Sequence, residues 1–282
     1  MRKRETGRPA RGSAERPGNA PPGNTSWAKR RTSRSAGGGR SAPRVELDTA
    51  ILYGWHSVAA ALANPARRIR RLMVTENAAK RLAEEGLTLP ESTQVVRPDE
   101  IARRLTPDAV HNGLYAEADP LDGPDLMAIP RDGIVLVLDQ ITDPHNVGAI
   151  MRSAAAFGVT AIVTTARHSP EATGVLAKSA SGALEYVPIV TTQNLARGLT
   201  VLKERGFLLV GLDSEGETEL ASLPLTAPLA LVLGAEGKGL RQLTRQTCDH
   251  NARLDLPGAI KSLNVSNAAA LALYIAATRL RT

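Results

Sequence analysis

The chain has 282 residues, of which 43% are hydrophobic, so it is long enough to bury the cores of two folding units. It has a single cysteine, Cys248, and its five histidines lack ligand spacing, which excludes a disulfide framework and argues against a metal centre. The sequence contains neither a run of about 18 apolar residues for a membrane span nor the apolar core of a secretory signal, so we expect a cytoplasmic protein.

The formal net charge of +7 is concentrated at the amino terminus. Residues 1–46 carry twelve Lys or Arg against three acids, or +9, which leaves about −2 for the rest. This segment is rich in Gly, Pro, Ser and Arg and has almost no aliphatic residues, so we predict a disordered tail. A basic arm suits a polyanion such as RNA, although a solvated, dispensable extension explains the composition equally well. A transit peptide is a further alternative, but the many Pro and Gly residues oppose its amphipathic helix.

Residues 47–118 alternate between helix and strand patterns and predict a compact α/β domain of about 70 residues. The expected elements are a helix within 51–65, a strand over 68–75, a helix over 76–86, a strand from 93, a helix over 98–105 and a strand over 113–118. Residues 119–132 then contain three Pro and four Asp, which is typical of a linker between domains.

From residue 133 to the end of the chain, continuous apolar strands alternate with helices, which predicts a parallel sheet covered on both faces. The expected strands are IVLVLDQ, VTAIVTT, YVPIV, FLLVGLD and LALVLGAE, and the expected helices run through AIMRSAAAFG, EATGVLAKSA and NLARGLTVLKERG. In open α/β sheets, ligands usually bind in the loops that follow the carboxyl ends of strands. The unusual residues of this chain lie in such loops.

The first unusual segment is LDQITDPHNVGAIMRSAAAFG, residues 138–158, where Asn146 is the expected cap of a helix that carries Arg152. Six residues apart, the two side chains are about 240° apart round an ideal helix. They converge on one ligand only if Asn146 lies in the loop and Arg152 reaches up from the second turn. Without further context, a plain helix cap and a solvated arginine explain the pair better.

The second segment is VLGAEGKGL, residues 232–240, which places Glu236 among three glycines after an apolar strand. Glycines there let the backbone approach a ligand closely. The spacing does not fit a phosphate loop, because Val232 and Gly239 occupy the first Gly and the hydroxyl positions. A dinucleotide fingerprint fails because Gln242 replaces the third Gly. A tight turn without a ligand is the alternative.

The third segment is LDLPGAIKSLNVSNAAALALYIAATRL, residues 254–280, which predicts a strand, a Pro-Gly loop and a long helix. The helix is apolar nearly all round, so we expect it to be buried, possibly against another subunit. Four polar residues gather at its start although capping needs only one of them, namely Ser262, Asn264, Ser266 and Asn267. The surplus indicates a ligand site.

In this order, the three segments resemble the SpoU (TrmH-type) branch of the SPOUT methyltransferases, which methylate ribose 2'-hydroxyls in RNA. The resemblance covers residues 133–282. YGWHSVAAAL and HNGLYAEA resemble the small α/β RNA-binding domain, similar to a ribosomal protein, that precedes it in several members. GAEGKGLRQLTRQTCD and SLNVSNAAAL are most similar to the bacterial enzymes that form 2'-O-methylguanosine in large-subunit ribosomal RNA.

The resemblance implies an S-adenosylmethionine-dependent enzyme with a C-terminal trefoil knot, which acts as a homodimer on RNA and uses no metal. It implies that the backbone around three residues holds the cofactor, namely Gly234, Leu256 and Leu263. The family's polar catalytic positions correspond to Asn146, Arg152, Glu236, Ser262 and Asn264.

Two roles for Arg152 stay open, because a protonated guanidinium is a poor base. It accepts the proton of the ribose hydroxyl in contact with RNA, or it clamps the adjacent phosphate and stabilises a hydroxyl deprotonated by solvent. Glu236 and Asn146 are expected to orient Arg152 or the ribose. Transfer RNA is the alternative substrate, and a non-catalytic ribosomal RNA-binding assembly factor is the alternative function.

Overall fold

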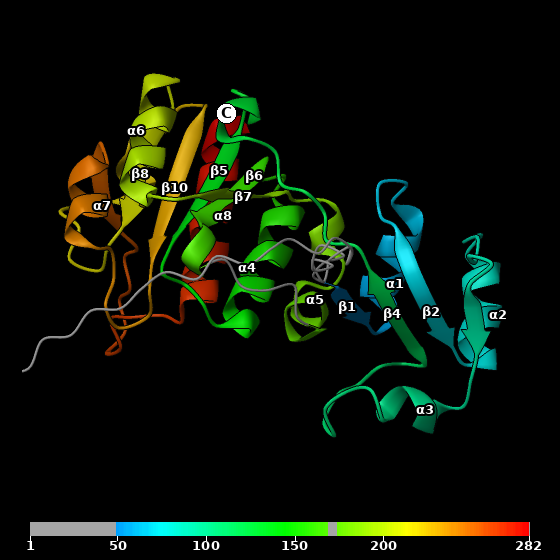
Figure 1. Ribbon diagram of the computed structural model, residues 1–282. Helices are drawn as coiled ribbons and strands as arrows, with labels where there is room; N and C mark the ends of the chain where they lie inside the picture. Colours follow the sequence, from blue (N-terminus) through cyan, green and yellow to red (C-terminus); the bar gives the residue numbers. More distant parts are fainter. Residues whose placement is uncertain (1–48, 169–173, 282) are drawn as a thin grey trace, which may run out of the picture. The chain divides into compact units, whose positions relative to one another are not determined.

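The computed structural model describes residues 49–168 and 174–281, and the predicted disordered tail of residues 1–46 lies outside the described residues. Two sheets, one mixed and one parallel, organise the described chain (Figure 1). The prediction of an α/β fold is therefore confirmed.

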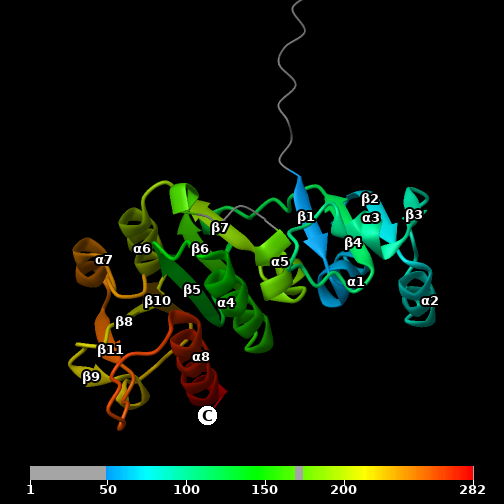
Figure 2. The same cartoon turned by 90° about the horizontal axis from the view of Figure 1, so that it is seen from below.

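The first sheet belongs to a small mixed α/β domain and has the strand order β1-β4-β2-β3. Its strands are β1 (Ala50–Tyr53), β2 (Ile69–Val74), β3 (Thr93–Val95) and β4 (Leu114–Ala118), and its helices are α1 (Trp55–Ala63), α2 (Glu76–Glu84) and α3 (Pro98–Ala102). Helices α1 and α2 bury their apolar side chains against one face of the sheet, and α3 lies on the other (Figure 2).

The predicted helix within residues 51–65 is too long at its start. Residues 50–53 instead form β1, which pairs antiparallel with β4. Gly54 makes the turn between strand and helix with φ of +83°, a conformation that glycine adopts readily. The helix therefore begins only at Trp55.

The second sheet has seven strands in the order β7-β6-β5-β10-β8-β11-β9, and every neighbouring pair is parallel, as predicted. The strands are β5 (Ile134–Asp139), β6 (Ala161–Thr165), β7 (Ile189–Thr192), β8 (Leu208–Leu212), β9 (Thr218–Glu219), β10 (Leu229–Gly234) and β11 (His250–Arg253). The sequence predicts a strand that begins at residue 254. The observed strand β11 instead ends at residue 253, and residues 254–264 form a loop.

Helices cover both faces of this sheet (Figure 1). One face carries α4 (Pro144–Ala156), α5 (Gly174–Ala180) and α8 (Val265–Arg281), and the other carries α6 (Leu195–Glu204) and α7 (Gln242–Thr247). Single turns of 3-10 helix occur at Leu126–Ala128, Ala166–His168, Ala183–Glu185 and Leu220–Ser222. Helix α8 is buried on one side only, because Leu271 and Tyr274 are 44% and 60% exposed.

The connection between the two sheets is packed over most of its length, which its composition did not predict. Gly123 lies against β7, where an added Cβ would be 1.9 Å from the carbonyl oxygen of Ile189. Ile129 is buried beneath α6, and the guanidinium of Arg205 donates hydrogen bonds to the carbonyls of Leu126 and Ile129. Asp119 is held by hydrogen bonds to Arg67 and Arg68, so only residues 120–122 are left as a tether.

A buried ion pair joins the small domain to the 3-10 turn Ala183–Glu185, which follows α5. The side chains of Arg67 and Glu185 are 3% and 2% exposed, and Arg67 Nη2 lies 2.7 Å from Glu185 Oε1. Arg67 Nε donates to both carboxylate oxygens at 3.1 Å, and Asn64 Nδ2 donates to Oε2 at 2.8 Å. Arg67 Nη1 donates to the carbonyl of Asp119. A fully satisfied buried pair of this kind fixes one packing geometry, because removal of either partner leaves a buried charge.

Candidate active site

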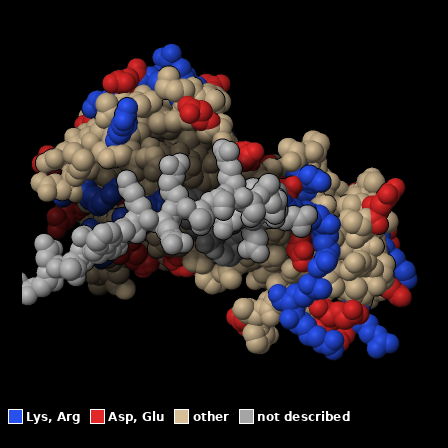
Figure 3. Space-filling view, viewed as in Figure 1, with Lys and Arg blue, Asp and Glu red and all other residues tan. Residues whose placement is uncertain are grey.

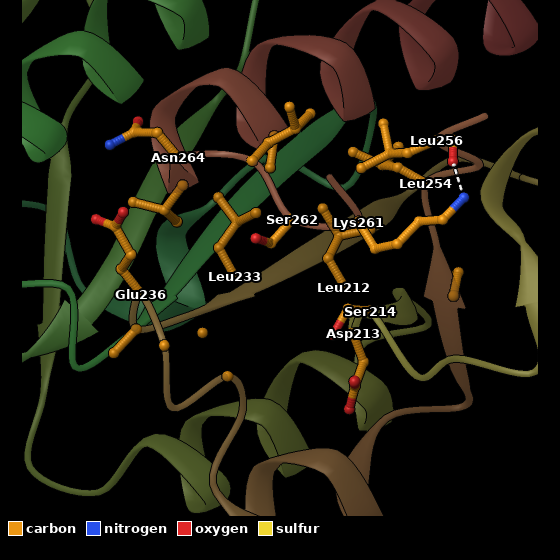
Figure 4. Close-up of a pocket in the computed structure, with 18 residues that line it drawn as sticks. Leu212, Asp213, Ser214, Leu233, Glu236, Leu254, Leu256, Lys261, Ser262 and Asn264 are labelled. Atoms are coloured by element: carbon orange, nitrogen blue, oxygen red, sulfur yellow. Dashed lines mark hydrogen bonds between the residues drawn. The ribbon is translucent and has the colours of Figure 1, made fainter. Parts of the chain in front are cut away.

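A pocket of about 730 Å³ opens where the carboxyl ends of β8, β10 and β11 meet, the position predicted for a ligand (Figure 4). Its wall includes leucines that follow or end these strands, namely Leu212, Leu233, Leu254 and Leu256. Glu236 and Asn264 lie at one end of the pocket, and Lys261 lies at the other (Figure 4). The site thus combines an apolar wall with polar groups at both ends, as small-molecule sites commonly do.

The glycine loop after β10 folds back on its own strand. Gly239 N donates to the carbonyl of Ala235 at 2.8 Å, and an added Cβ on Gly234 would lie 2.2 Å from the carbonyl carbon of Gly239. Gly237 and Gly239 both have positive φ, of +75° and +66°. Only glycines allow this turn, and the turn brings Glu236 to the rim of the pocket.

A buried carboxylate anchors the same loop from below. Asp139, the last residue of β5, has a fully buried side chain whose Oδ1 accepts from Arg241 Nε at 2.6 Å. Its Oδ2 accepts from the backbone N–H of Arg241 at 3.1 Å. The loop after β10 is therefore tied to the end of β5, where the segment that carries Asn146 begins.

Three polar side chains from separate segments meet beside the pocket. Asn264 Nδ2 donates to Asn146 Oδ1 at 3.0 Å, and Asn146 Nδ2 donates to Glu236 Oε2 at 3.5 Å, a long contact. Asn264 Oδ1 accepts from the backbone N–H and the hydroxyl of Ser266, at 2.9 and 2.6 Å, at the start of α8. Asn264 therefore both orders the helix start and orients the amide of Asn146.

The predicted role of Asn146 as a helix cap is wrong. Asp143 is the N-cap of α4, and its side chain accepts from the N–H of His145 at 3.1 Å. Asn146 lies in the first turn of the helix, so its side chain is left for the contacts with Asn264 and Glu236.

The structure brings most of the predicted site residues together. Six of them line the pocket, namely Gly234, Glu236, Leu256, Ser262, Leu263 and Asn264, and Asn146 joins through its hydrogen bonds. Arg152 does not. It is exposed on α4, about 9 Å along the helix from Asn146, and does not line the pocket. Within residues 49–168 and 174–281, it makes no hydrogen bond or ion pair in its own chain.

The pocket is also lined by three residues that were not predicted from the sequence, namely Asp213, Ser214 and Lys261. Asp213 accepts from the N–H of Glu215 and pairs with Arg245 Nε at 3.2 Å. Lys261 Nζ donates to the carbonyl of Leu256 at 2.7 Å and closes the loop before α8 (Figure 4). A signal for Asp213 was available, because FLLVGLD ends in Leu-Asp just as IVLVLD does.

Cys248 and its neighbour Asp249 lie outside this pocket and have displaced pKa values. Burial raises the pKa of Cys248 to about 12, and the charge of Asp249 adds to the effect. Burial alone would raise the pKa of Asp249, but hydrogen bonds from Lys203 and from the N–H of Leu209 lower it overall. Neither group faces the site, so both concern stability and reactivity rather than catalysis.

No group of three or more His, Cys, Asp or Glu in the described ranges could hold a metal ion. No helix in the part of the chain that the structure describes has the length and apolar character of a membrane span.

Comparison with known proteins gives consistent matches over both sheets. Residues 133–274 match the family described as SpoU rRNA Methylase, and residues 51–124 match that described as RNA 2'-O ribose methyltransferase substrate binding. The 23S rRNA (guanosine-2'-O-)-methyltransferase RlmB of Pseudomonas putida is 39% identical over 234 residues, which cover 79% of this chain and 94% of that protein. The protein of the same name from Ralstonia nicotianae is 37% identical over 232 residues, with 79% and 93% covered.

Among solved structures, the SpoU methyltransferase AviRb from Streptomyces viridochromogenes in complex with AdoMet has the same fold. The TM-score is 0.70 at 24% sequence identity, and the match covers 84% of this chain and 92% of that chain.

Proposed function

Because the chain belongs to the SpoU rRNA Methylase family, we propose that it transfers a methyl group from S-adenosylmethionine to the 2'-hydroxyl of a guanosine in 23S ribosomal RNA. The relatives named above carry that activity in their names and match 79% of this chain. The structural observation that carries the proposal is the contact of Asn146, Glu236 and Asn264 beside a pocket of cofactor size.

The pocket fits the cofactor in size and chemistry. Its volume of about 730 Å³ is within the range of small-molecule sites, and its leucines suit an adenine ring. The turn at Gly234 has no room for a side chain. Gly234, Leu256 and Leu263 line the pocket, and we propose that they hold the cofactor through their backbone groups. When bound, S-adenosylmethionine supplies an electrophilic methyl group on its sulfonium.

Asn146 and Glu236 orient the ribose. Because Asn264 donates to Asn146 Oδ1, the Asn146 amide turns its Nδ2 toward Glu236 Oε2. The other carboxylate oxygen of Glu236 has no hydrogen bond from the described residues and can accept one from a ribose hydroxyl. Ser262 lies between the two ends of the pocket and presents its hydroxyl to it (Figure 4).

Glu236→Gln preserves the shape of the site and removes the charge. We expect kcat to fall by about 10- to 100-fold at saturating RNA, because hydrogen bonds to an ionised acceptor are about twice as strong as neutral ones. An unchanged kcat would show that the loop geometry alone matters.

The position of Arg152 supports a homodimer. A guanidinium that assists at the ribose must reach the pocket, and Arg152 does not do so in its own chain. Leu271 and Tyr274 on α8 leave an apolar face for a second copy. In the dimer that we propose, the Arg152 of one subunit serves the pocket of the other and takes up the proton or clamps the adjacent phosphate.

Complementation tests this arrangement. Arg152→Ala and Asn264→Ala should each abolish turnover, and a mixture should regain about a quarter of the wild-type rate, because half of the dimers are mixed and each has one intact site. An inactive mixture, or a monomer by light scattering at micromolar concentration, would contradict the proposal. Near-full turnover of Arg152→Lys with saturating RNA would exclude both of the roles proposed for Arg152.

The small domain, residues 47–118, is the proposed contact surface for the RNA beyond the modified nucleotide, joined by the linker of residues 119–132 to the methyltransferase domain of residues 133–282. Arginines cluster on it near β4 and α3, interleaved with acids (Figure 3). The most exposed are Arg68 and Arg103, whose side chains are 84% and 74% exposed. Such side chains contact phosphates and make binding dependent on salt.

We also propose the trefoil knot at the carboxyl end. The loops 235–239 and 254–264 line one pocket together with the start of α8, and α8 packs against α4, which brings the end of the chain among earlier loops. Stretching the chain between residues 133 and 282 with optical tweezers tests it. A tightened knot leaves the unfolded chain shorter than its expected ~3.6 Å per residue, and a chain of full length would exclude the knot.

The decisive experiment incubates the protein with isotopically labelled S-adenosylmethionine and undermethylated ribosomal and transfer RNA. Mass spectrometry of the nucleosides should find labelled 2'-O-methylguanosine in ribosomal RNA alone. Label in transfer RNA would identify transfer RNA as the substrate instead. Cofactor binding without label in naked RNA or in precursor particles would favour a non-catalytic role.

A further inference from the structure

A second cavity opens at the same edge of the parallel sheet, on the side of α6 and α7. It has a volume of about 260 Å³ and is lined by residues that follow β6, β7 and β10, among them Arg167, Gln193 and Arg241. Hydroxyl and amide side chains make up much of the remaining wall, and no described residue that lines it is acidic. Its size and composition suit one small anionic group. We call it the Arg167–Arg241 pocket.

Asp139 holds the side chain of Arg241 in place at this pocket. The buried carboxylate binds Arg241 through Nε and through the backbone N–H, and the arginine side chain is still 44% exposed. Its two terminal nitrogens have no hydrogen bond to any residue that the structure describes, and the side chain lines the cavity. A guanidinium fixed at Nε and open at both terminal nitrogens is preorganised for an anion, because a planar fork matches phosphate geometry.

The net charge of the pocket comes from Arg167. Asp139 neutralises the charge of Arg241, so Arg241 contributes directed hydrogen bonds rather than net charge. Arg167 is exposed and forms no ion pair within residues 49–168 and 174–281, so none of these residues pairs with its charge. The first turn of α6, which begins at Leu195, adds the positive end of a ten-residue helix to the same cavity.

The chain places this pocket close to the chemistry. Arg241 follows Glu236 by five residues, so at most ~18 Å of backbone separates the two, and the turn at Gly239 shortens the distance further. The loop that presents Glu236 to the cofactor pocket therefore also presents Arg241 to the second cavity. An RNA strand that lies across this edge of the sheet meets both.

We propose that the Arg167–Arg241 pocket binds a backbone phosphate of the substrate RNA near the methylated ribose, an inference that rests on the proposed function. The phosphate oxygens accept from the terminal nitrogens of Arg241 and from Arg167. The pocket thereby adds affinity for the strand close to the ribose site, because phosphate contacts hold a nucleic acid without reading its sequence.

Arg167→Gln tests the proposal, and Arg197→Gln is the matched control. Arg197 is also exposed, lies on α6 and loses the same charge, but it does not line the pocket. Binding of 23S ribosomal RNA transcribed in vitro is measured by filter binding over a range of salt concentrations. For Arg167→Gln, we expect the slope of log affinity against log salt to fall by about 0.7 to 0.9, one phosphate contact, and the KM for RNA to rise about 5- to 10-fold.

Two further readouts separate this role from a structural one. The kcat of Arg167→Gln at saturating RNA and its Kd for S-adenosylmethionine should stay at wild-type values, whereas Arg197→Gln should change neither slope nor KM by more than about a third of these amounts. Arg241→Lys keeps the charge and loses the fork, so it should raise the KM for RNA by a similar factor. Its thermal unfolding temperature shows whether the loop stays folded.

The outcomes distinguish this proposal from the proposed function. If the wild type methylates RNA and Arg167→Gln behaves as Arg197→Gln does in slope and KM, the phosphate pocket is wrong and the function stands. If the wild type forms no labelled nucleoside, the function fails, and the binding slopes still decide whether the pocket holds an RNA phosphate.

Discussion

Gly234→Ala is the sharpest test of the cofactor pocket. An added Cβ would lie 2.2 Å from the carbonyl carbon of Gly239, 2.4 Å from its oxygen and 2.4 Å from Leu240 N, all backbone atoms. Ordinary contacts start near 3.4 Å, so the loop must move by about 1 Å, and no flexible side chain can absorb the shift. Because Glu236 lies on that loop, both the cofactor and the ribose geometry change.

A displacement of this size at a reacting centre costs on the order of 100-fold in rate, and overpacking costs about 1–3 kcal/mol in stability. We expect Gly234→Ala to weaken S-adenosylmethionine binding by at least about 10-fold in calorimetry and to lower kcat by about 100-fold. Gly258→Ala is the control, because its Cβ would have no atom within 4 Å and its φ is not positive. Wild-type affinity and rate in a folded Gly234→Ala protein would refute this account of the loop.

Three further predictions concern stability and reactivity. Arg67→Met should cost about 3–5 kcal/mol in denaturant unfolding, because Glu185 stays buried without its main partner, and adding Glu185→Leu should restore at least half of that loss. A cost below 1 kcal/mol would mean that the contact is open to water. Because burial raises the pKa of Cys248 to about 12, iodoacetamide at pH 8 should label it only after unfolding, and rapid labelling of the native protein would contradict this. The pKa of Asp249 is lowered in the folded protein, so its pairing with Lys203 stabilises above the unfolded pKa of about 4, and this contribution is lost as the pH falls through the folded value. Asp249→Asn should therefore cost about 1 kcal/mol at pH 7 and progressively less as the pH falls below the unfolded pKa, as measured by denaturant titration at a series of pH values.

The parallel sheet could be predicted from the sequence because a strand covered on both faces has a continuous apolar run, as in IVLVLD and LALVLG. β1 was missed because its apolar residues run directly into those of α1, and only the pairing with β4 separates them. β11 was displaced because its residues, His250–Arg253, have no apolar pattern and owe their strand conformation to pairing with β8 and β9. Local sequence carries no information on such partners.

In the candidate site, too, some residues could be predicted from the sequence and others could not. The polar residues around Asn264 and the glycines around Glu236 could be recognised as site residues from the sequence. Both groups exceed what a helix cap or a turn requires. The contribution of Asp139 could not be predicted, because its role depends on its contact with Arg241, which follows 102 residues later in the chain. Asp143, only three residues before Asn146, took the capping role because its side chain reaches the N–H of His145.

The buried contact between Arg67 and Glu185 means that the two domains do not depend on the backbone connection alone to stay together. With Asp119 bound to Arg67, Gly123 against β7 and Arg205 bound to two linker carbonyls, only residues 120–122 act as a tether. A tether of that length contributes an effective concentration in the millimolar range, whereas the packed interface that contains this contact contributes the intrinsic affinity. A chain cut within the tether would therefore persist as a noncovalent heterodimer, and the two pieces, produced separately, would assemble wherever their concentration exceeds the Kd of that interface.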